Sequence, residues 1–318
     1  MMKSTHKIVP HLWFDKEAKE AAQFYCSIFP DARITNLTVL HDTPSGDCDI
    51  VSFELSGQSF MAISAGPLFR FNPSLSFIVN FDPSKDANAR QHLDQMWEQL
   101  SAGGTALMPL DTYPFSEHYG WIQDKYGLSW QLMLTNPGGE ERPFIVPTLL
   151  FVGAVCGKAE EATDFYLSVF SSNPNSGSDH TNTKRGNLYR YPKGVQPDDE
   201  GTIMFTDFMI GGEWFAAMDS AYDHKFAFNE AVSLLVQCES QEEIDYFWKA
   251  LSAVPEAEQC GWLKDTYGVS WQITSTDLEE MMRHGSREQI DRITRAFLPM
   301  KKIDVAILKK AYEEAAGS

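Results

Sequence analysis

The chain contains one long unit twice. The segment AAQFYCSIF at 21–29 returns as ATDFYLSVF at 162–170, and GWIQDKYGLSWQL at 120–132 returns as GWLKDTYGVSWQI at 261–273. Both pairs show one shift of 141 positions, seen from Tyr25 to Tyr166 and from Gln131 to Gln272. A repeat of this length predicts two domains of one architecture. We place them at residues 1–140 and 141–276, with a non-repeated tail at 277–318.

Each unit repeats one order of secondary structure within itself. Residues 8–14 form a strand-like apolar run, 17–29 carry apolar side chains at helical spacing, and three β-rich segments follow by residue 64. The same order starts again at 75–81. We therefore predict an α+β protein with four βαβββ modules, two in each domain.

Two segments depart from the repeat. Residues 171–201 are polar, rich in turn-forming residues and longer than most connections, so we expect a mobile hairpin or a lid there. After residue 275, three segments with helical patterns predict a helical C-terminal extension, and Pro299 separates the second helix from the third.

Composition excludes several classes of partner. The net charge of −18, without a cluster of Lys and Arg, opposes binding to nucleic acid or to anionic lipid. No window offers the roughly 18 uninterrupted apolar residues of a membrane span, and the first residues lack a secretory signal pattern, so we expect a cytoplasmic protein. The five cysteines form no close pair or Cys/His cluster, which argues against a disulfide framework or a zinc site.

The doubled module, with FY…F on its first helix, SFMAIS in the middle and GW..D.YG.SWQ at its end, resembles the vicinal oxygen chelate superfamily of glyoxalases, bleomycin-resistance proteins and dioxygenases. More narrowly, it is similar to the PhnB-like branch, whose domain carries the name 3-demethylubiquinone-9 3-methyltransferase. The resemblance implies tandem glyoxalase/bleomycin-resistance-like domains whose curved sheets form cups, with the helices outside. Two domains in one chain would then mimic the dimer of single-domain relatives, and a homodimer of the whole chain is an alternative.

The resemblance also implies where a metal would be held in each unit. Carried over by motif, the ligand positions fall on Gln131 with Ser76, Ser64 and a residue near His11 in the first unit, and on Gln272 with Ser233, Asp219 and a residue near Thr148 in the second. Such a set supplies no paired histidines and at most one carboxylate per cup. Neutral amide and hydroxyl oxygens hold a divalent ion weakly, so we expect no metal and no other cofactor.

The same positions are candidates for binding an organic ligand. Strand alternation turns Gln131 and Gln272 toward a cup and the neighbouring tryptophans toward the helices. Trp121 and Trp262 would add an apolar wall. The predicted ligand-binding residues are His11, Ser76, Trp121 and Gln131 for a first cup, and Thr148, Asp219, Ser233, Trp262 and Gln272 for a second. The alternative for each is structural: a glutamine that satisfies buried backbone groups, a core histidine, or tryptophans that only pack. We expect the second cup to be the better formed, closed by residues 171–201.

Three functions are compatible with these observations. The first is a protein that binds an unknown small molecule in metal-poor cups, as a binding protein or as an enzyme of unknown reaction. The second is a metal-dependent lyase, isomerase or dioxygenase of the glyoxalase type, and the third is a non-catalytic interaction module. Methyl transfer by a doubly wound domain is not predicted, because no glycine-rich loop follows a strand and opens a helix.

Overall fold

The computed structural model describes residues 6–136, 138, 140–174 and 182–314. Four modules follow one another along the chain, as predicted. The first contains β1 (Ile8–Phe14), α1 (Ala18–Ile28), β2 (Arg33–Thr43), β3 (Gly46–Leu55) and β4 (Gln58–Ser64). The second contains β5 (Leu75–Phe81), α2 (Ala89–Ser101), β6 (Thr105–Tyr113), β7 (Ser116–Gln123) and β8 (Ser129–Leu134).

The second unit has the same order with one departure. Its first module contains β9 (Ile145–Val152), the short 3-10 helix η1 (Gly153–Val155), α3 (Ala159–Ser171), β10 (Lys184–Arg190), β11 (Ile203–Ile210) and β12 (Glu213–Ser220). Its last module contains β13 (Val232–Cys238), α4 (Gln241–Leu251), the 3-10 helix η3 (Pro255–Ala257), β14 (Trp262–Lys264) and β15 (Ser270–Ser275). A 3-10 turn thus stands where the other modules have their first strand after the helix.

Of the two alternatives predicted for residues 171–201, the described part fits a hairpin and not a lid over the face that carries Gln272. Residues 184–190 form the edge strand β10, which pairs with β11. This strand belongs to the sheet that does not contain Gln272. The prediction for residues 175–181 lies outside the described residues.

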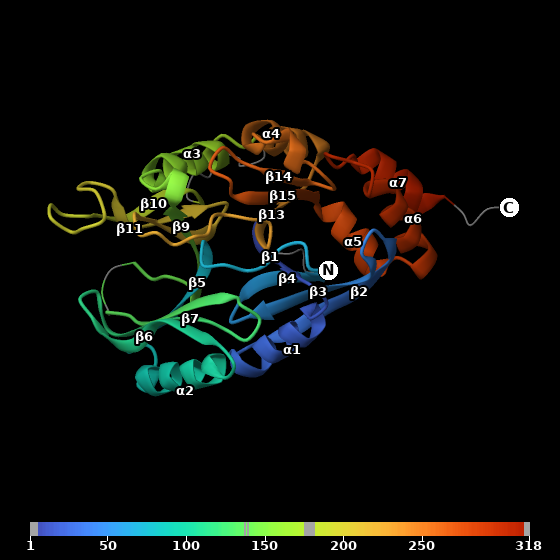
Figure 1. Ribbon diagram of the computed structural model, residues 1–318. Helices are drawn as coiled ribbons and strands as arrows, with labels where there is room; N and C mark the ends of the chain where they lie inside the picture. Colours follow the sequence, from blue (N-terminus) through green and yellow to red (C-terminus); the bar gives the residue numbers. More distant parts are fainter. Residues whose placement is uncertain (1–5, 137, 139, 175–181, 315–318) are drawn as a thin grey trace.

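Each sheet combines one module from each unit. The strands of the described residues form a seven-stranded sheet in the order β14-β15-β13-β1-β4-β3-β2 and an eight-stranded sheet in the order β10-β11-β12-β9-β5-β8-β7-β6. The joints are antiparallel, between β1 and β13 and between β5 and β9. In Figure 1 the first unit forms the lower layer and the second unit the upper layer, so that each sheet bends from one layer into the other.

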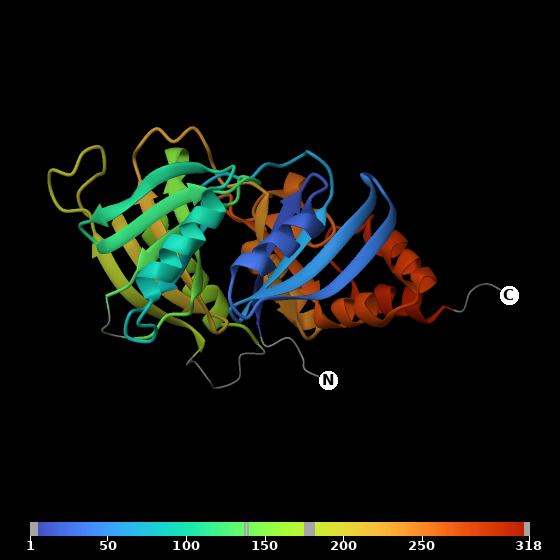
Figure 2. The ribbon, with the colours of Figure 1, turned by 90° about the horizontal axis from the view of Figure 1, so that it is seen from below.

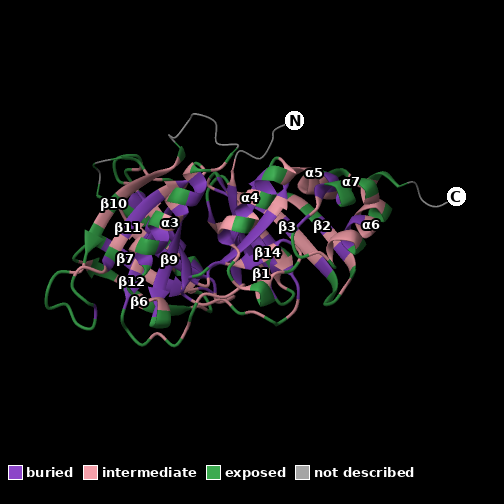
Figure 3. Cartoon of the chain, turned by 90° about the horizontal axis from the view of Figure 1, so that it is seen from above, coloured by how far each residue is buried: buried purple, intermediate pink, exposed green. Residues whose placement is uncertain are grey.

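The module helices cover the outer faces of the sheets. Helices α1 and α2 lie below the lower layer, and α3 and α4 lie above the upper layer (Figure 1). Figure 2, seen from below, shows α1 and α2 each crossing the strands of its own module. Figure 3 shows buried residues concentrated in the strands, with exposed residues along the outer sides of the helices and in the loops.

The repeated motif D.YG.SW is explained by one buried network. In the second unit, Asp265 accepts hydrogen bonds from the Tyr166 hydroxyl at 2.7 Å, the Trp271 indole at 2.9 Å and the backbone N–H groups of Tyr267 and Val269. Asp124 accepts the equivalent set in the first unit. The carboxylate therefore ties the first helix of each unit to the turn before its last strand.

The C-terminal extension is helical, as predicted, and completes the seven-stranded sheet. It contains α5 (Thr276–His284), α6 (Arg287–Phe297) and α7 (Val305–Glu313). The backbone N–H groups of Cys260 and Gly261 donate to the carbonyls of Met300 and Lys301, both at 2.7 Å. The connection between α6 and α7 thus hydrogen-bonds to the turn before β14, near the place of the missing strand. The three helices close the end of this sheet between β2 and β15 (Figure 1).

No helix among the described residues is long and apolar enough to cross a lipid bilayer.

Candidate functional site

The tertiary structure regroups the predicted site residues across the two units. At the joint between β1 and β13, His11 stands opposite Ser233, and at the joint between β5 and β9, Thr148 stands opposite Ser76. We call the concave face of the seven-stranded sheet with His11, Ser233, Trp262 and Gln272 the Gln272 cup. The equivalent face of the eight-stranded sheet, with Thr148, Ser76, Trp121 and Gln131, is the Gln131 cup. The prediction of one cup within each unit is therefore wrong: His11 joins second-unit residues and Thr148 joins first-unit residues.

The Gln272 cup contains a cavity of about 170 Å³. Its floor carries His11, Trp13 and Gln272, and an apolar wall comes from strands of both units and from the C-terminal extension. The apolar lining residues of this wall are Leu40, Ile50, Met61, Ile63, Leu235, Ile273, Leu278, Met282, Phe297 and Ile303. The extension therefore contributes part of the cavity wall, a role that repeat analysis does not reveal because no copy of this segment exists.

His11 is a buried imidazole to which the described residues offer no hydrogen bond. Its side chain is 3% exposed, and its Nδ1 is buried without any partner among the residues that the structure describes. Burial lowers the pKa of His11 to about 3, so the ring is neutral at physiological pH. The ring of Trp262 meets it edge to face, with centroids 5.4 Å apart, and also meets Trp13 at 5.9 Å. Because Nδ1 is closed to solvent, only other atoms of this neutral ring line the cavity and can meet a ligand.

Gln272 has one engaged and one free group. Its amide nitrogen donates to the Ser233 hydroxyl at 2.8 Å. Within the described ranges, no donor reaches its carbonyl oxygen Oε1, and the indole N–H of Trp262 has no acceptor. Ser270 Oγ beneath them is buried and also has no partner there. The fold orients the polar groups of this cup, but the described residues do not provide hydrogen-bond partners for all of them.

A carboxylate lies at the edge of the Gln272 cavity. Glu279 on α5 lines the cavity and accepts hydrogen bonds from Gln237 and Arg283, both at 2.6 Å. Burial raises the pKa of Glu279. Cys260, another lining residue, donates to the Leu298 carbonyl at 3.2 Å, and burial raises the pKa of its thiol to about 11. This thiol is therefore protonated at neutral pH and is no activated nucleophile.

In the Gln131 cup the equivalent groups satisfy one another. The Tyr119 hydroxyl donates to Gln131 Oε1 at 2.7 Å, and the Gln131 amide nitrogen donates to Ser76 at 2.7 Å. The Trp121 indole donates to the Ser129 hydroxyl at 2.7 Å. Thr148, the counterpart of His11, donates to the Val146 carbonyl. The repeat aligns these residues with those of the Gln272 cup. It does not reveal that, among the described residues, only the groups of the Gln131 cup all have hydrogen-bond partners.

Asp219 lies outside both cups, contrary to the prediction. It accepts hydrogen bonds from the backbone N–H groups of Gly157, Ala159 and Ile203, at 2.8, 3.1 and 2.9 Å. Its strand neighbours Trp214 and Ala216 face the cup, whereas Phe215 and Ala217 belong to the core beneath the helices. The period of two places Asp219 on the core side, where it fixes the start of α3.

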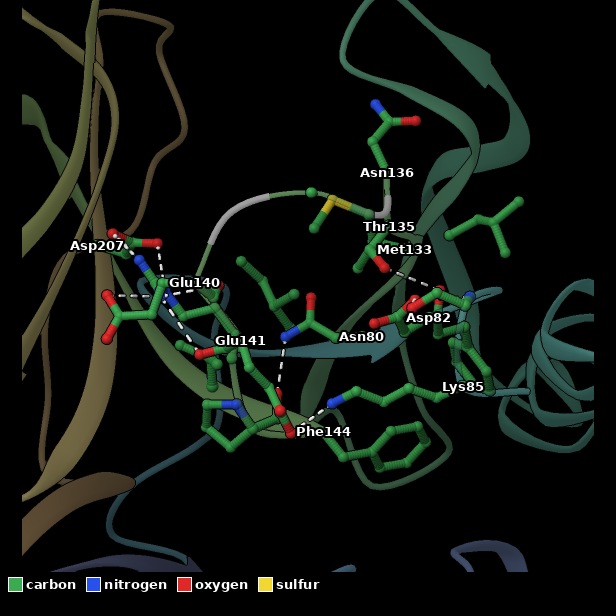
Figure 4. A pocket seen from close by; sticks show the side chains of 18 of the residues that line it. Asn80, Asp82, Lys85, Met133, Thr135, Asn136, Glu140, Glu141, Phe144 and Asp207 are labelled. Carbon is green, nitrogen blue, oxygen red and sulfur yellow. Dashed lines mark hydrogen bonds and ion pairs between the residues drawn. The ribbon is translucent and has the colours of Figure 1, made fainter.

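A second, larger cavity of about 650 Å³ lies beside the segment that joins the two units (Figure 4). Its lining residues Ile78, Met133 and Val146 face the same side of the eight-stranded sheet as the Gln131 cup, so this cavity adjoins that cup. Arg142 from this segment pairs with the buried Asp207 at 2.9 Å and stacks on the Trp214 ring, with 3.6 Å between the guanidinium carbon and the ring centroid. Lys85 pairs with Glu141 on the other side. Sequence analysis missed these groups, because Arg142 lies in a connecting segment. The lining carries five carboxylates against two cations, and Asp207, Glu141 and Glu140 already pair with Arg142, Lys85 and Lys184.

The donor sets do not fit a divalent metal. The Gln272 cup offers one imidazole, one amide oxygen and one serine hydroxyl, and its only carboxylate is already bound to Gln237 and Arg283. Hard cations require several carboxylate or carbonyl oxygens, and transition metals require imidazole or thiolate groups in number. Throughout the described part of the chain, no group of three or more His, Cys, Asp or Glu side chains converges on one point.

Comparison with known families agrees with this architecture. The model of the 3-demethylubiquinone-9 3-methyltransferase family matches residues 6–133 and again 143–274. The chain therefore belongs to this family, and it carries the family's domain twice in tandem. No curated protein matches the chain.

Solved structures show the same fold. Glyoxalase I from Zea mays matches 88% of this chain and 98% of its own, with a TM-score of 0.52 and 9% identity, which supports the fold alone. A PhnB protein of Bacillus cereus, which carries the same methyltransferase name, is 34% identical over 41% of this chain and 100% of its own, with a TM-score of 0.37.

Proposed function

We propose that this protein binds a small organic molecule in the Gln272 cup. The observation that carries the proposal is the Gln272 carbonyl oxygen, to which no described residue donates, in a cavity that the neutral His11 ring also lines. A ligand in this cavity that donates to Gln272 Oε1 gains a hydrogen bond and also removes the apolar wall from water.

Binding is better supported than catalysis. Burial favours the neutral imidazole of His11 and the thiol of Cys260. The one lining carboxylate, Glu279, already accepts hydrogen bonds from Gln237 and Arg283, so the described part of the cup offers no unengaged charged base and no thiolate. Among the described residues no carboxylate bonds to His11 to raise its basicity. An enzyme of unknown reaction is consistent with the family, and a substrate would occupy the same cup.

The test is a melting-temperature screen of a metabolite library on three proteins: the wild type, His11→Phe and Thr148→Val. The first variant keeps a flat ring but removes both nitrogens. The second is the matched control, because Thr148 is the counterpart of His11 in the other cup. We expect compounds that stabilise the wild type and Thr148→Val but not His11→Phe. Hits that are lost only in Thr148→Val would contradict the proposal, as would a library without hits.

A metal-dependent enzyme is the second candidate, favoured only by the fold of the superfamily. Because the donor set does not fit, we expect elemental analysis of the purified protein to show no stoichiometric divalent metal. About one zinc, iron or manganese ion per chain, lost on changing Gln272 to Leu, would contradict this expectation. The cytoplasmic location and a homodimer of the whole chain stay predictions.

A further inference from the structure

Next to their glutamines, the two cups differ by one aromatic side chain. In the Gln131 cup the Tyr119 ring lies against Phe115 and Tyr113, with centroids 4.9 and 5.5 Å apart, and its hydroxyl donates to Gln131. The shift of 141 positions places Cys260 where the first unit has Tyr119. The hairpin of β6 and β7, which carries this aromatic group, has no counterpart in the last module, where η3 replaces the first of these strands.

Tyr119 therefore shows which kind of hydrogen-bond donor the carbonyl oxygen of such a glutamine accepts. Both glutamines donate to an equivalent serine, Ser76 or Ser233, so their carbonyl oxygens are oriented by the same kind of bond. In one cup a phenol hydroxyl of the chain itself reaches that oxygen at 2.7 Å. In the other cup no group of the described chain does so, and a cavity lies there instead.

Size and charge restrict the molecule that fits. A cavity of about 170 Å³ is close to the 150 Å³ of a void that holds one benzene molecule. Its lining contains no Lys or Arg, and its imidazole is neutral. The lining carboxylate, Glu279, would repel an anion, and Arg283 and Gln237 already occupy it. An uncharged compound with a single ring meets these conditions.

We propose that the ligand of the Gln272 cup is an uncharged, single-ring aromatic compound with a ring hydroxyl, bound once per chain, whose O–H donates to Gln272 Oε1 as the Tyr119 hydroxyl donates to Gln131. The inference rests on the proposed function and specifies its ligand. Trp13, Trp262 and Met61 pack against the ring, and the His11 imidazole bonds to a second polar group where the ligand carries one.

The experiment compares three probes by titration calorimetry on the full-length protein: phenol, methoxybenzene and benzoate. Phenol should bind at one site per chain. Methoxybenzene has the same ring but no donor, so it leaves Gln272 Oε1 unpaired and should bind about tenfold more weakly. Benzoate should not bind, because no cation in the lining offsets its charge.

Variants test whether Gln272 causes the preference for phenol. In Gln272→Leu the preference for phenol over methoxybenzene should disappear, while Gln131→Leu, the matched change in the other cup, should keep it. Tyr119→Ala removes the internal phenol and should create a second phenol site, raising the stoichiometry to two. Far-UV circular dichroism of each variant shows whether it is folded.

The outcomes separate this inference from the proposed function. Benzoate or methoxybenzene binding as well as phenol, with all binding lost in His11→Phe, would leave the Gln272 cup a binding site and refute the hydroxyl donor. A phenol preference that survives in folded Gln272→Leu would refute it as well. If none of the probes and no library compound bind at His11, both proposals fail.

Discussion

At the scale of single residues, the two units use the same side chains for different purposes. Asp124 and Asp265 hold one network in both units, and the glutamines of the last strands hold the same serine contact. The difference arises around the glutamine, where only Gln131 meets a tyrosine hydroxyl. A repeated residue therefore has a structural role where its hydrogen-bond partners are also repeated, as for the two aspartates. It is available to a ligand where one partner is missing, as for Gln272.

Changing Asp265 to Asn tests the structural role of the buried carboxylate network. The carboxylate accepts from Tyr166 and Trp271 at one oxygen and from two backbone N–H groups at the other, so an amide N–H₂ must face donors. We expect a loss of about 2–4 kcal/mol in the free energy of unfolding, measured by urea titration. Asp124→Asn should cost a similar amount because its contacts are equivalent, and a cost below about 1 kcal/mol for either would contradict this account of the motif.

His11 should make the stability depend on pH. The unfolded chain binds a proton on this residue near pH 6.5, whereas the folded protein does so only near pH 3, so the unfolded state carries more protons between these values. The contribution of a neutral His11 is therefore complete above pH 6.5 and is lost as the pH falls toward 3, by up to about 1.4 kcal/mol per pH unit.

The measurement is urea unfolding of the wild type and His11→Phe from pH 7.5 to 4.5. The stability difference between the two proteins should shift steadily in favour of the variant as the pH falls, because other titrating groups are common to both. Parallel curves would show that His11 is protonated equally in the folded and unfolded states.

At the scale of elements, the C-terminal extension has two structural roles. It supplies carbonyl groups to the turn before β14, and it places Leu278, Met282, Phe297 and Ile303 in the wall of the Gln272 cavity. Gly261 is required at this contact, because a Cβ there would lie 2.8 Å from the Ile273 carbonyl oxygen and its φ is +88°. The extension is thus a part of the cup and not an appendage to it.

Shortening Ile303 tests this contact. Its side chain is 1% exposed, so Ile303→Ala should destabilise the protein by about 2–4 kcal/mol and enlarge the cavity. The control in the same extension is Ile307→Ala on α7, where the side chain is 50% exposed and the change should stay within about 0.5 kcal/mol. Equal effects of the two changes in urea unfolding would show that the extension does not pack as described.

At the scale of the whole molecule, the sheets require both units. Strand β1 pairs with β13 and β5 pairs with β9, so neither unit alone contains a complete sheet. Lys7, before β1, also forms an ion pair at 2.5 Å with Glu243 on α4, whose side chain is 1% exposed. The two units are therefore joined by backbone hydrogen bonds and by a partly buried charge pair.

Separating the units should expose both joints. We expect residues 1–140 and 141–318, produced as two chains, to associate in a 1:1 complex, and residues 1–140 alone to form a dimer or to aggregate through unpaired β1 and β5. Size-exclusion chromatography with light scattering measures both. A stable folded monomer of residues 1–140 would contradict the requirement for cross-unit pairing.

Local patterns in the sequence determined the four modules, the helical tail and the family, because hydrophobic periodicity and turn residues act within each module. They also indicated that His11, Ser76, Trp121, Gln131, Thr148, Ser233, Trp262 and Gln272 face a cup. The partner of each module depended on the tertiary structure. Both units carry the same edge strands, and local sequence does not distinguish pairing within a unit from pairing across units.

Asp219 was misplaced because a shift of one residue along a strand moves a side chain to the opposite face of the sheet. The free Gln272 oxygen was also decided in three dimensions, because it depends on whether a residue 12 positions away, Tyr119 beside Gln131 or Cys260 beside Gln272, reaches the amide.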